Sequence, residues 1–206
     1  MKNRKDFVAQ PNNFTKDLEG LTLNMLNQHY KLYEGYVKKT NEIQAKADSA
    51  DKSEANGVYS LIGELKREET FAVNGMKLHE IYFGHLQGNG DLSSAPNLSA
   101  MIGKDFGSVE AWQEEMVATG MSARGWAVLA FDFCDNRLHV YGSDAHNVGA
   151  VWGAIPVIAL DVYEHAYAID YGISRKAYID SFFKNLDWAY AERIVGEYEL
   201  VNRLGV

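Results

Sequence analysis

The first half of the chain places apolar residues at three- and four-residue steps, the spacing of a helix that buries one face. One such run covers residues 21–47, and a second covers residues 57–86. Residues 48–56, between the two runs, are small and charged like those of a loop. Because a short connection favours antiparallel neighbours, the sequence predicts a helical hairpin at the start of the fold.

The composition changes in the middle of the chain. Residues 87–99 are rich in Gly, Ser, Asn and Pro, which favours a linker. We therefore expect a helical-hairpin domain over residues 1–90 and a second domain over residues 91–206. Two shorter helices are predicted in the second half, near residues 98–105 and 108–123.

The pattern then takes the two-residue period of strands. Residues 125–134 and 137–142 flank Asp135-Asn136, a pair that suits a tight hairpin turn. Residues 155–162 form a third apolar run, and residues 174–203 are helical again. The predicted fold class is α+β: an N-terminal antiparallel helical hairpin, followed by an α/β domain with a three-stranded antiparallel sheet.

Composition narrows the classes of function. The 206 residues are 47% hydrophobic and 23% charged, and no apolar run is long enough to cross a membrane. The start of the chain lacks the apolar core of a secretory signal, so we expect a cytoplasmic protein. The 20 Lys and Arg against 28 Asp and Glu give a net charge of −8, which argues against nucleic-acid partners. The single Cys134 excludes an internal disulfide and a multi-cysteine metal site.

Asp161 and His165 stand four residues apart, directly after the third predicted strand. Such a pair is common and has an ordinary structural interpretation. The longer string DVYEHAY, over residues 161–167, resembles the DVWEHAY signature of the iron/manganese superoxide dismutases. The resemblance covers about residues 14–200. The other matching residues are His79, Phe83, Phe106-Gly107-Ser108, Gly125-Trp126-Ala127, Asp170-Tyr171, Arg175, Tyr178-Ile179 and Trp188.

The resemblance implies an activity and a cofactor. Members of this family convert superoxide to dioxygen and hydrogen peroxide by one-electron cycling of a single Fe or Mn ion in each subunit. The resemblance also implies a homodimer or a homotetramer, and it makes His79, Asp161 and His165 metal ligands. Imidazole and carboxylate donors without thiolate suit Fe or Mn better than a structural zinc ion. Between the two metals we expect iron.

The fourth ligand is expected on the first helix, where the family has a ligand His eight residues before a gateway Tyr. Tyr36 matches that Tyr, but His29 stands seven residues before it, and Gln28 stands eight before it. Positions seven apart on an α-helix differ by only about 20° around the axis, so His29 and Tyr36 can share one face. We take His29 as the ligand. The alternative is that His29 faces solvent and the metal site is incomplete.

The resemblance implies further groups around the metal. Tyr36 and His146 would relay protons, with His146 replacing a Gln that hydrogen-bonds the metal-bound solvent and tunes the metal. Gly75 stands at the other position that the family uses for that Gln. Phe71 and Trp126 would form an apolar wall, although buried aromatics are common in any core.

Two further roles lie at the edge of the expected site. Glu164 would orient the partner subunit's His165 across an interface, which makes the oligomer part of the site; the alternative is a carboxylate at a helix start. Arg175, Lys31 and Lys38 are candidates for a positive field that attracts superoxide. The two lysines could equally belong to a solvated helix face.

Several residues depart from the family pattern. Tyr163 replaces the Trp of the signature, and Val128 replaces the second Trp of a GWAW motif. Ala168 stands where the family has a Tyr, and the His that pairs with that Tyr is also absent, at Leu32 or Tyr33. These departures support one alternative: a non-catalytic structural or binding protein that retains the dismutase fold.

The remaining candidates are expected to be structural. His85 ends the second helix, where a cation would be favoured by the helix dipole. His139 alternates with apolar residues on a strand and is expected at the surface. Cys134 lies near the hairpin turn and is expected to be unreactive.

Overall fold

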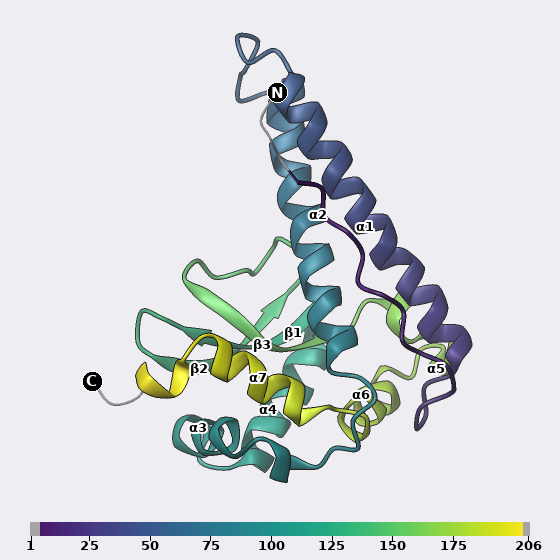
Figure 1. Ribbon diagram of the computed structural model, residues 1–206, viewed down its shortest axis with the longest axis vertical. Helices are drawn as coiled ribbons and strands as arrows, with labels where there is room; N and C mark the ends of the chain where they lie inside the picture. The colour runs from purple at the N-terminus through teal and green to yellow at the C-terminus, as the bar shows by residue number, and fades with distance from the viewer. Residues whose placement is uncertain (1–4, 204–206) are drawn as a thin grey trace.

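The computed structural model describes residues 5–203. Helices α1 (Leu23–Ser49) and α2 (Leu61–Gly84) pack antiparallel and project from the rest of the molecule (Figure 1). A hydroxyl caps the start of each helix. The Thr22 hydroxyl accepts a backbone N–H of the first turn of α1, and the Ser60 hydroxyl does the same for α2. The predicted helical hairpin is therefore confirmed.

The sheet lies at the base of the hairpin, with strands in the order β2-β1-β3 (Figure 1). Both neighbouring pairs are antiparallel, as predicted. The central strand β1 is almost entirely buried, which explains its continuous apolar run. Asn136, in the turn between β1 and β2, has a φ of 56°, a value that Asn tolerates better than most residues. The strand bounds are β1 (Trp126–Asp132), β2 (Arg137–Ser143) and β3 (Ala154–Asp161).

Shorter helices cover the sheet. Helices α3 and α4 contact β2, α4 also contacts β1, and α2 and α7 contact β3. The bounds of the helices after the hairpin are η1 (Leu92–Ser94), α3 (Pro96–Phe106), α4 (Val109–Ser122), η2 (Glu164–Ala166), α5 (Ala168–Tyr171), α6 (Arg175–Lys184), α7 (Trp188–Glu197) and η3 (Leu200–Arg203).

Residues 174–203 are helical as predicted, but they do not form one continuous helix. The chain forms α6, breaks at residues 185–187, and continues as α7 and then η3. The break has a local cause, because the Asp187 carboxylate accepts the Tyr190 N–H at 3.1 Å and so caps a new helix. Ser108 begins α4 in the same way, because its hydroxyl oxygen accepts the Ala111 N–H at 3.1 Å.

The predicted linker is tied to the body of the protein. Gly88 N–H donates to the Asn185 carbonyl at 2.9 Å, and Gly90 N–H donates to Leu186 at 3.2 Å. The largest group of buried apolar side chains also joins the hairpin, through Leu26 and Tyr82, to the sheet. The division of the chain at residue 90 stays a prediction, and the α+β fold class is confirmed.

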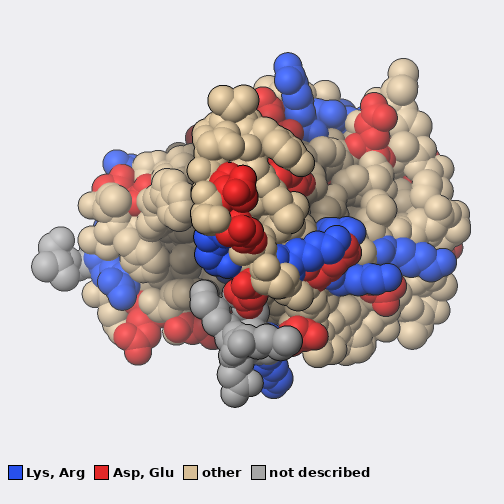
Figure 2. All heavy atoms as spheres, turned by 90° about the horizontal axis from the view of Figure 1, so that it is seen from above, with Lys and Arg blue, Asp and Glu red and all other residues tan. Residues whose placement is uncertain are grey.

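Among residues 5–203, no helix is long and apolar enough to span a membrane. Acidic and basic side chains are interspersed on the face seen from the outer end of the hairpin (Figure 2). The net charge of −8 is therefore not gathered into a single-sign patch on that face.

Candidate metal centre

Four side chains from three parts of the fold meet at the base of the hairpin. His29 comes from α1, His79 from α2, Asp161 from the end of β3, and His165 from η2 directly after it. Their candidate ligand atoms all lie within 4.8 Å of one another. The site thus brings together the ligand set that the sequence predicted.

One carboxylate oxygen is the centre of this cluster. The Nε2 atoms of His29, His165 and His79 lie 3.1, 3.2 and 3.5 Å from Asp161 Oδ2. The other oxygen, Oδ1, accepts the Tyr163 backbone N–H at 2.9 Å, which fixes the orientation of the carboxylate. His29 is only 1% exposed, so the alternative of a solvent-facing His29 is wrong.

The spacing on α1 agrees with the helix geometry. The helix is regular from Leu23 to Ser49, without a π-bulge. His29 and Tyr36 therefore point to the same side, and both rings contact the ring of His79, with centroids 5.0 and 5.2 Å away. A seven-residue separation suffices because two turns of a regular α-helix return the chain to nearly the same face.

The electrostatics of the cluster favour a bound cation. Burial alone would raise the pKa of Asp161, but His165 and His29 outweigh this and hold it well below the usual range. Burial lowers the pKa of His29, and burial with His29 lowers the pKa of His79 to about 3. The site therefore presents a buried carboxylate together with neutral imidazoles at His29 and His79, the protonation states in which these groups bind metal.

His79 supplies a direct test of fit. Its Nδ1–H donates to the Gly75 carbonyl at 2.6 Å, which leaves a lone pair on Nε2. That Nε2 atom is buried and has no hydrogen-bond partner. Because an unsatisfied buried nitrogen is costly, a metal ion at this position explains its orientation. Nitrogen and carboxylate donors without thiolate fit Fe or Mn.

A hydrogen-bonded chain of side chains adjoins the ligands. Trp126 Nε1–H donates to His146 Nδ1 at 2.9 Å, and His146 Nε2 lies 2.8 Å from the Tyr36 hydroxyl. Burial raises the pKa of Tyr36 to about 12 and lowers that of His146 to about 4. At neutral pH the chain thus consists of a protonated phenol, a neutral imidazole and an indole.

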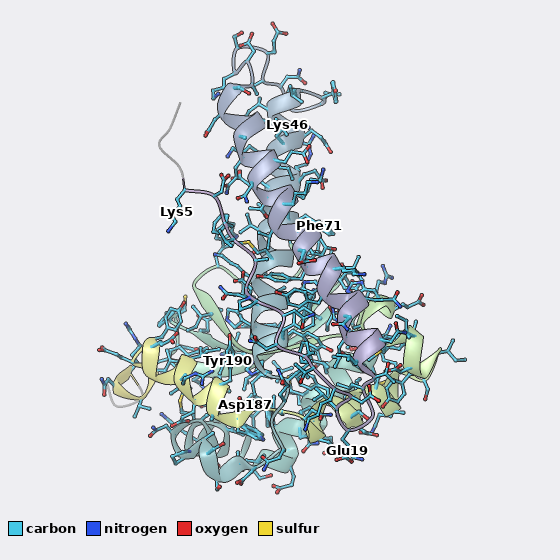
Figure 3. The ribbon with its side chains drawn as sticks, turned by 45° about the vertical axis from the view of Figure 1, so that its right-hand side comes forward. Lys5, Glu19, Lys46, Phe71, Asp187 and Tyr190 are labelled. Carbon is cyan, nitrogen blue, oxygen red and sulfur yellow. The ribbon has the colours of Figure 1, made fainter. Side chains whose placement is uncertain are left out.

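Aromatic rings enclose this chain. Phe71, partway along the hairpin in Figure 3, lies 4.5 Å from the ring of His146 and 6.0 Å from that of Tyr36. Tyr163 stacks on His165 at 5.2 Å and contacts His146 at 5.1 Å. Each of these predicted site residues therefore lies beside a ligand or beside the hydrogen-bonded chain.

The predicted outer groups lie differently. Glu164 is exposed and makes no side-chain hydrogen bond or ion pair within residues 5–203. Arg175 is held by Tyr167 Oη and by carbonyls at the end of α4, with Ala123 O at 2.8 Å. Lys31 and Lys38 are exposed on α1.

Sequence reasoning missed two supporting features. The Tyr178 hydroxyl donates to the Asp161 backbone carbonyl at 2.8 Å and lies 3.1 Å from that of Tyr82, so two buried phenols brace the ligand strand. Gly75 leaves room for the proton chain, since a Cβ there would lie 2.9 Å from Tyr36 Cδ1 and 3.1 Å from His146 Cδ2. A Tyr within a helical run gives no such signal, whereas a Gly inside a helix does.

The structural candidates outside the site are partly as expected. His139 is half-exposed and pairs with Asp135 at 2.9 Å. Asp132 raises the pKa of the Cys134 thiol, which agrees with an unreactive cysteine. The expectation that the helix dipole favours a protonated His85 is wrong, because burial lowers the pKa of this imidazole to about 3.

Comparisons with known proteins agree with this geometry. The sequence profile of the iron/manganese superoxide dismutases, C-terminal domain, matches residues 94–194. The chain is 47% identical over 177 residues to a superoxide dismutase [Fe] of Aquifex pyrophilus, covering 84% of this chain and 83% of that one. It is 46% identical over 185 residues to a superoxide dismutase [Fe] of Aquifex aeolicus, covering 87% of each chain.

A manganese relative is more distant. The chain is 37% identical over 160 residues to superoxide dismutase [Mn] 2 of Haloferax volcanii, covering 78% of this chain and 79% of that one. The fold and the three-histidine, one-aspartate centre define a mononuclear redox metalloenzyme. The chain belongs to the iron/manganese superoxide dismutase family and is an enzyme of that type, as the sequence predicted. Its intact ligand set and its relatives do not support the non-catalytic alternative.

Proposed function

We propose that this enzyme removes superoxide with one iron ion in each subunit, held by His29, His79, Asp161 and His165. The observation that carries the proposal is the convergence of three histidine Nε2 atoms within 3.5 Å of one Asp161 oxygen. Iron rather than manganese is supported by the two Aquifex relatives, both of which are iron superoxide dismutases by name.

Iron bound there supplies the one-electron redox chemistry by which one superoxide is oxidised to dioxygen and a second is reduced. The protein must supply two protons to each hydrogen peroxide that leaves. Tyr36 and His146 form the proposed route, because their 2.8 Å hydrogen bond joins the half-buried phenol to an imidazole beside the ligands. Phe71 and Tyr163 shield that bond from bulk water.

Metal exchange tests the choice of iron. The purified protein is stripped, loaded separately with iron or manganese, and assayed for superoxide removal alongside elemental analysis. We expect the iron form to be the active one. Activity confined to the manganese form would overturn the proposed metal.

Ligand variants test the site itself. Asp161→Ala and His79→Ala are each expected to lose bound metal and activity together. His139→Ala is the matched control, since His139 lies on β2 and bonds only Asp135 among the described residues. Full activity in either ligand variant would contradict the assigned centre.

We also propose a homodimer or homotetramer with Glu164 at a subunit interface. The carboxylate of Glu164 is exposed and has no hydrogen-bond or ion-pair partner within residues 5–203. His165 uses Nε2 toward Asp161, and its other ring nitrogen has no hydrogen bond among those residues. The two unpaired groups are adjacent in sequence. A two-fold interface at this place would let Glu164 of each subunit pair with the partner subunit's His165. A cytoplasmic location stays a prediction.

A further inference from the structure

The chain contains three Asn-Gly pairs, at residues 56–57, 74–75 and 89–90. In such a pair the side-chain amide is open to attack by the next backbone nitrogen, because glycine has no Cβ to obstruct the approach. The attack needs a nitrogen that is free of hydrogen bonds and a backbone that can bend toward the side chain. The three pairs therefore differ in reactivity through the structure around each of them.

Two of the pairs are held by the fold. Gly75 lies inside α2, where its N–H belongs to the helical hydrogen bonds and its backbone is fixed. Gly90 is half-buried and donates its N–H to the Leu186 carbonyl at 3.2 Å. In both pairs the nitrogen that would attack is already bound, so Asn74 and Asn89 are protected.

The pair Asn56-Gly57 lies in the loop that joins α1 to α2, at the outer end of the hairpin (Figure 1). Both residues are exposed, and the Gly57 N–H makes no hydrogen bond with residues 5–203. A Cβ on Gly57 would meet nothing within 4 Å, so the backbone has room to bend. Of the three pairs, this one has a free nitrogen beside the amide.

The loop also prepares the side-chain carbonyl of Asn56 for attack. Its Oδ1 accepts the backbone N–H groups of Val58 at 3.0 Å and of Tyr59 at 2.9 Å. Two donors at such distances stabilise the negative charge that develops on the oxygen when a nucleophile adds to Cγ, as in an oxyanion hole. They also hold the side chain back against its own backbone, on the side of the Gly57 nitrogen.

We propose that Asn56 is a site of spontaneous deamidation, at which the hairpin loop acquires a carboxylate. The Gly57 nitrogen bonds to Asn56 Cγ, the bond from Cγ to Nδ2 breaks, and ammonia leaves with the backbone proton. The cyclic imide that results takes up one water molecule. Opening at Cγ gives aspartate, and opening at the main-chain carbonyl carbon gives isoaspartate, with no change of oxidation state.

The modification alters the outer end of the hairpin. Either product adds one negative charge beside Val58 and Tyr59, whose side chains are 94% and 71% exposed. Isoaspartate also lengthens the main chain by one carbon, which moves the acceptor oxygen away from the two N–H groups. None of the four candidate metal ligands lies in this loop, so the inference does not depend on the proposed function.

Peptide mapping by mass spectrometry of the full-length, iron-loaded enzyme tests the site. The enzyme is incubated in water enriched in heavy oxygen, so that only deamidation during the incubation carries the label. We expect labelled aspartate and isoaspartate at position 56 to exceed those at positions 74 and 89 by about 10-fold or more, because the protected pairs must first open locally. No label at position 56, or equal labelling of the three positions, would overturn the inference.

Unfolding the protein shows whether the structure makes this choice. In guanidinium chloride the three pairs lose their different surroundings, and we expect their rates to become alike. A preference for Asn56 that persists in the unfolded chain would contradict the argument from the loop, because the neighbouring sequence alone would then cause it.

A variant tests the attacking nitrogen. Gly57→Ala places a Cβ where the structure has room for it, and should slow the reaction at Asn56 by about 10-fold while the other two positions keep their rates. Asn74 and Asn89 are thus controls within the same molecule. An unchanged rate at Asn56 in the folded variant would rule out attack by the nitrogen of residue 57.

Discussion

At the scale of single residues, the lack of a side chain at Gly75 makes room for two groups of the site. Its missing Cβ lets Tyr36 and His146 reach each other beside α2. Gly35 on α1 is also helical, but a Cβ there would meet nothing within 4 Å. Packing therefore requires glycine at position 75, whereas Gly35 only carries the ordinary cost of a glycine in a helix.

We expect Gly75→Ala to destabilise the protein by about 1–3 kcal/mol, the usual cost of an added methyl in a packed region. Gly35→Ala, its matched control, should stabilise by up to about 1 kcal/mol, because alanine favours the helix. Denaturant unfolding measures both. Equal stability of the two variants would show that the Gly75 contacts relax at no cost.

His85 leads to a prediction about pH. It is fully buried, its ring packs against Tyr190 at 4.9 Å, and burial lowers its pKa to about 3 (Tyr190 is labelled in Figure 3). Between pH 6.5 and about 3 the unfolded chain binds a proton at His85 that the folded chain does not. This residue therefore removes stability as pH falls, by up to about 1.4 kcal/mol per pH unit.

We expect His85→Leu to flatten the loss of stability between pH 6 and pH 4, as measured by urea unfolding. His139→Leu is the control, because the His139 side chain reaches solvent in the folded state. A wild-type slope in the His85 variant would contradict the assignment. The sequence could not predict this burial, since a histidine at the last turn of a helix has the same pattern whether or not a later helix covers it.

At the scale of elements, periodicity predicted most of the fold. The hairpin, the two short helices before the sheet and all three strands lie within a few residues of their expected positions. The division of the final helical stretch into α6 and α7 was not predicted, because the apolar spacing continues across the break and only Asp187 marks it. A capping residue occupies a single position, so it is easily overlooked where the helical spacing of apolar residues continues on both sides of it.

The contribution of the Asp187 cap to the start of α7 can be tested by substitution. We expect Asp187→Ala to cost about 0.5–2 kcal/mol of folding stability, since the Tyr190 N–H would lose its acceptor. Asp187→Asn keeps an acceptor oxygen and should retain most of that stability. Thermal unfolding compares the two, and an alanine variant as stable as the wild type would mean that the backbone alone sets the break.

The metal ligands were predictable for a different reason. His79, Asp161 and His165 follow from a long specific string and its companions, and His29 follows from the two-turn spacing of a regular helix. The hydrogen bond from Trp126 to His146 was not predictable. It depends on a strand register and on a loop that brings His146 to the end of β1, neither of which has a pattern in the sequence.

At the scale of the whole molecule, the proposed oligomer with Glu164 at a subunit interface can be tested by substitution. We expect Glu164→Ala to weaken subunit association by about 10-fold or more, because truncating one partner of a charged interfacial hydrogen bond costs about 2–5 kcal/mol. Glu114→Ala, on the exposed side of α4, is the control. Analytical ultracentrifugation measures both, and unchanged association of the Glu164 variant would place the interface elsewhere.

The order in which the ligands occur along the chain has a consequence for synthesis. His29 and His79 precede Asp161, which is 132 residues beyond His29. A growing chain thus presents two imidazoles long before it has the carboxylate around which they gather. The complete set of four ligands therefore forms only after residues 161–165 have been synthesised and have packed against the hairpin, so metal binding joins the N-terminal hairpin to the second half of the chain late in folding.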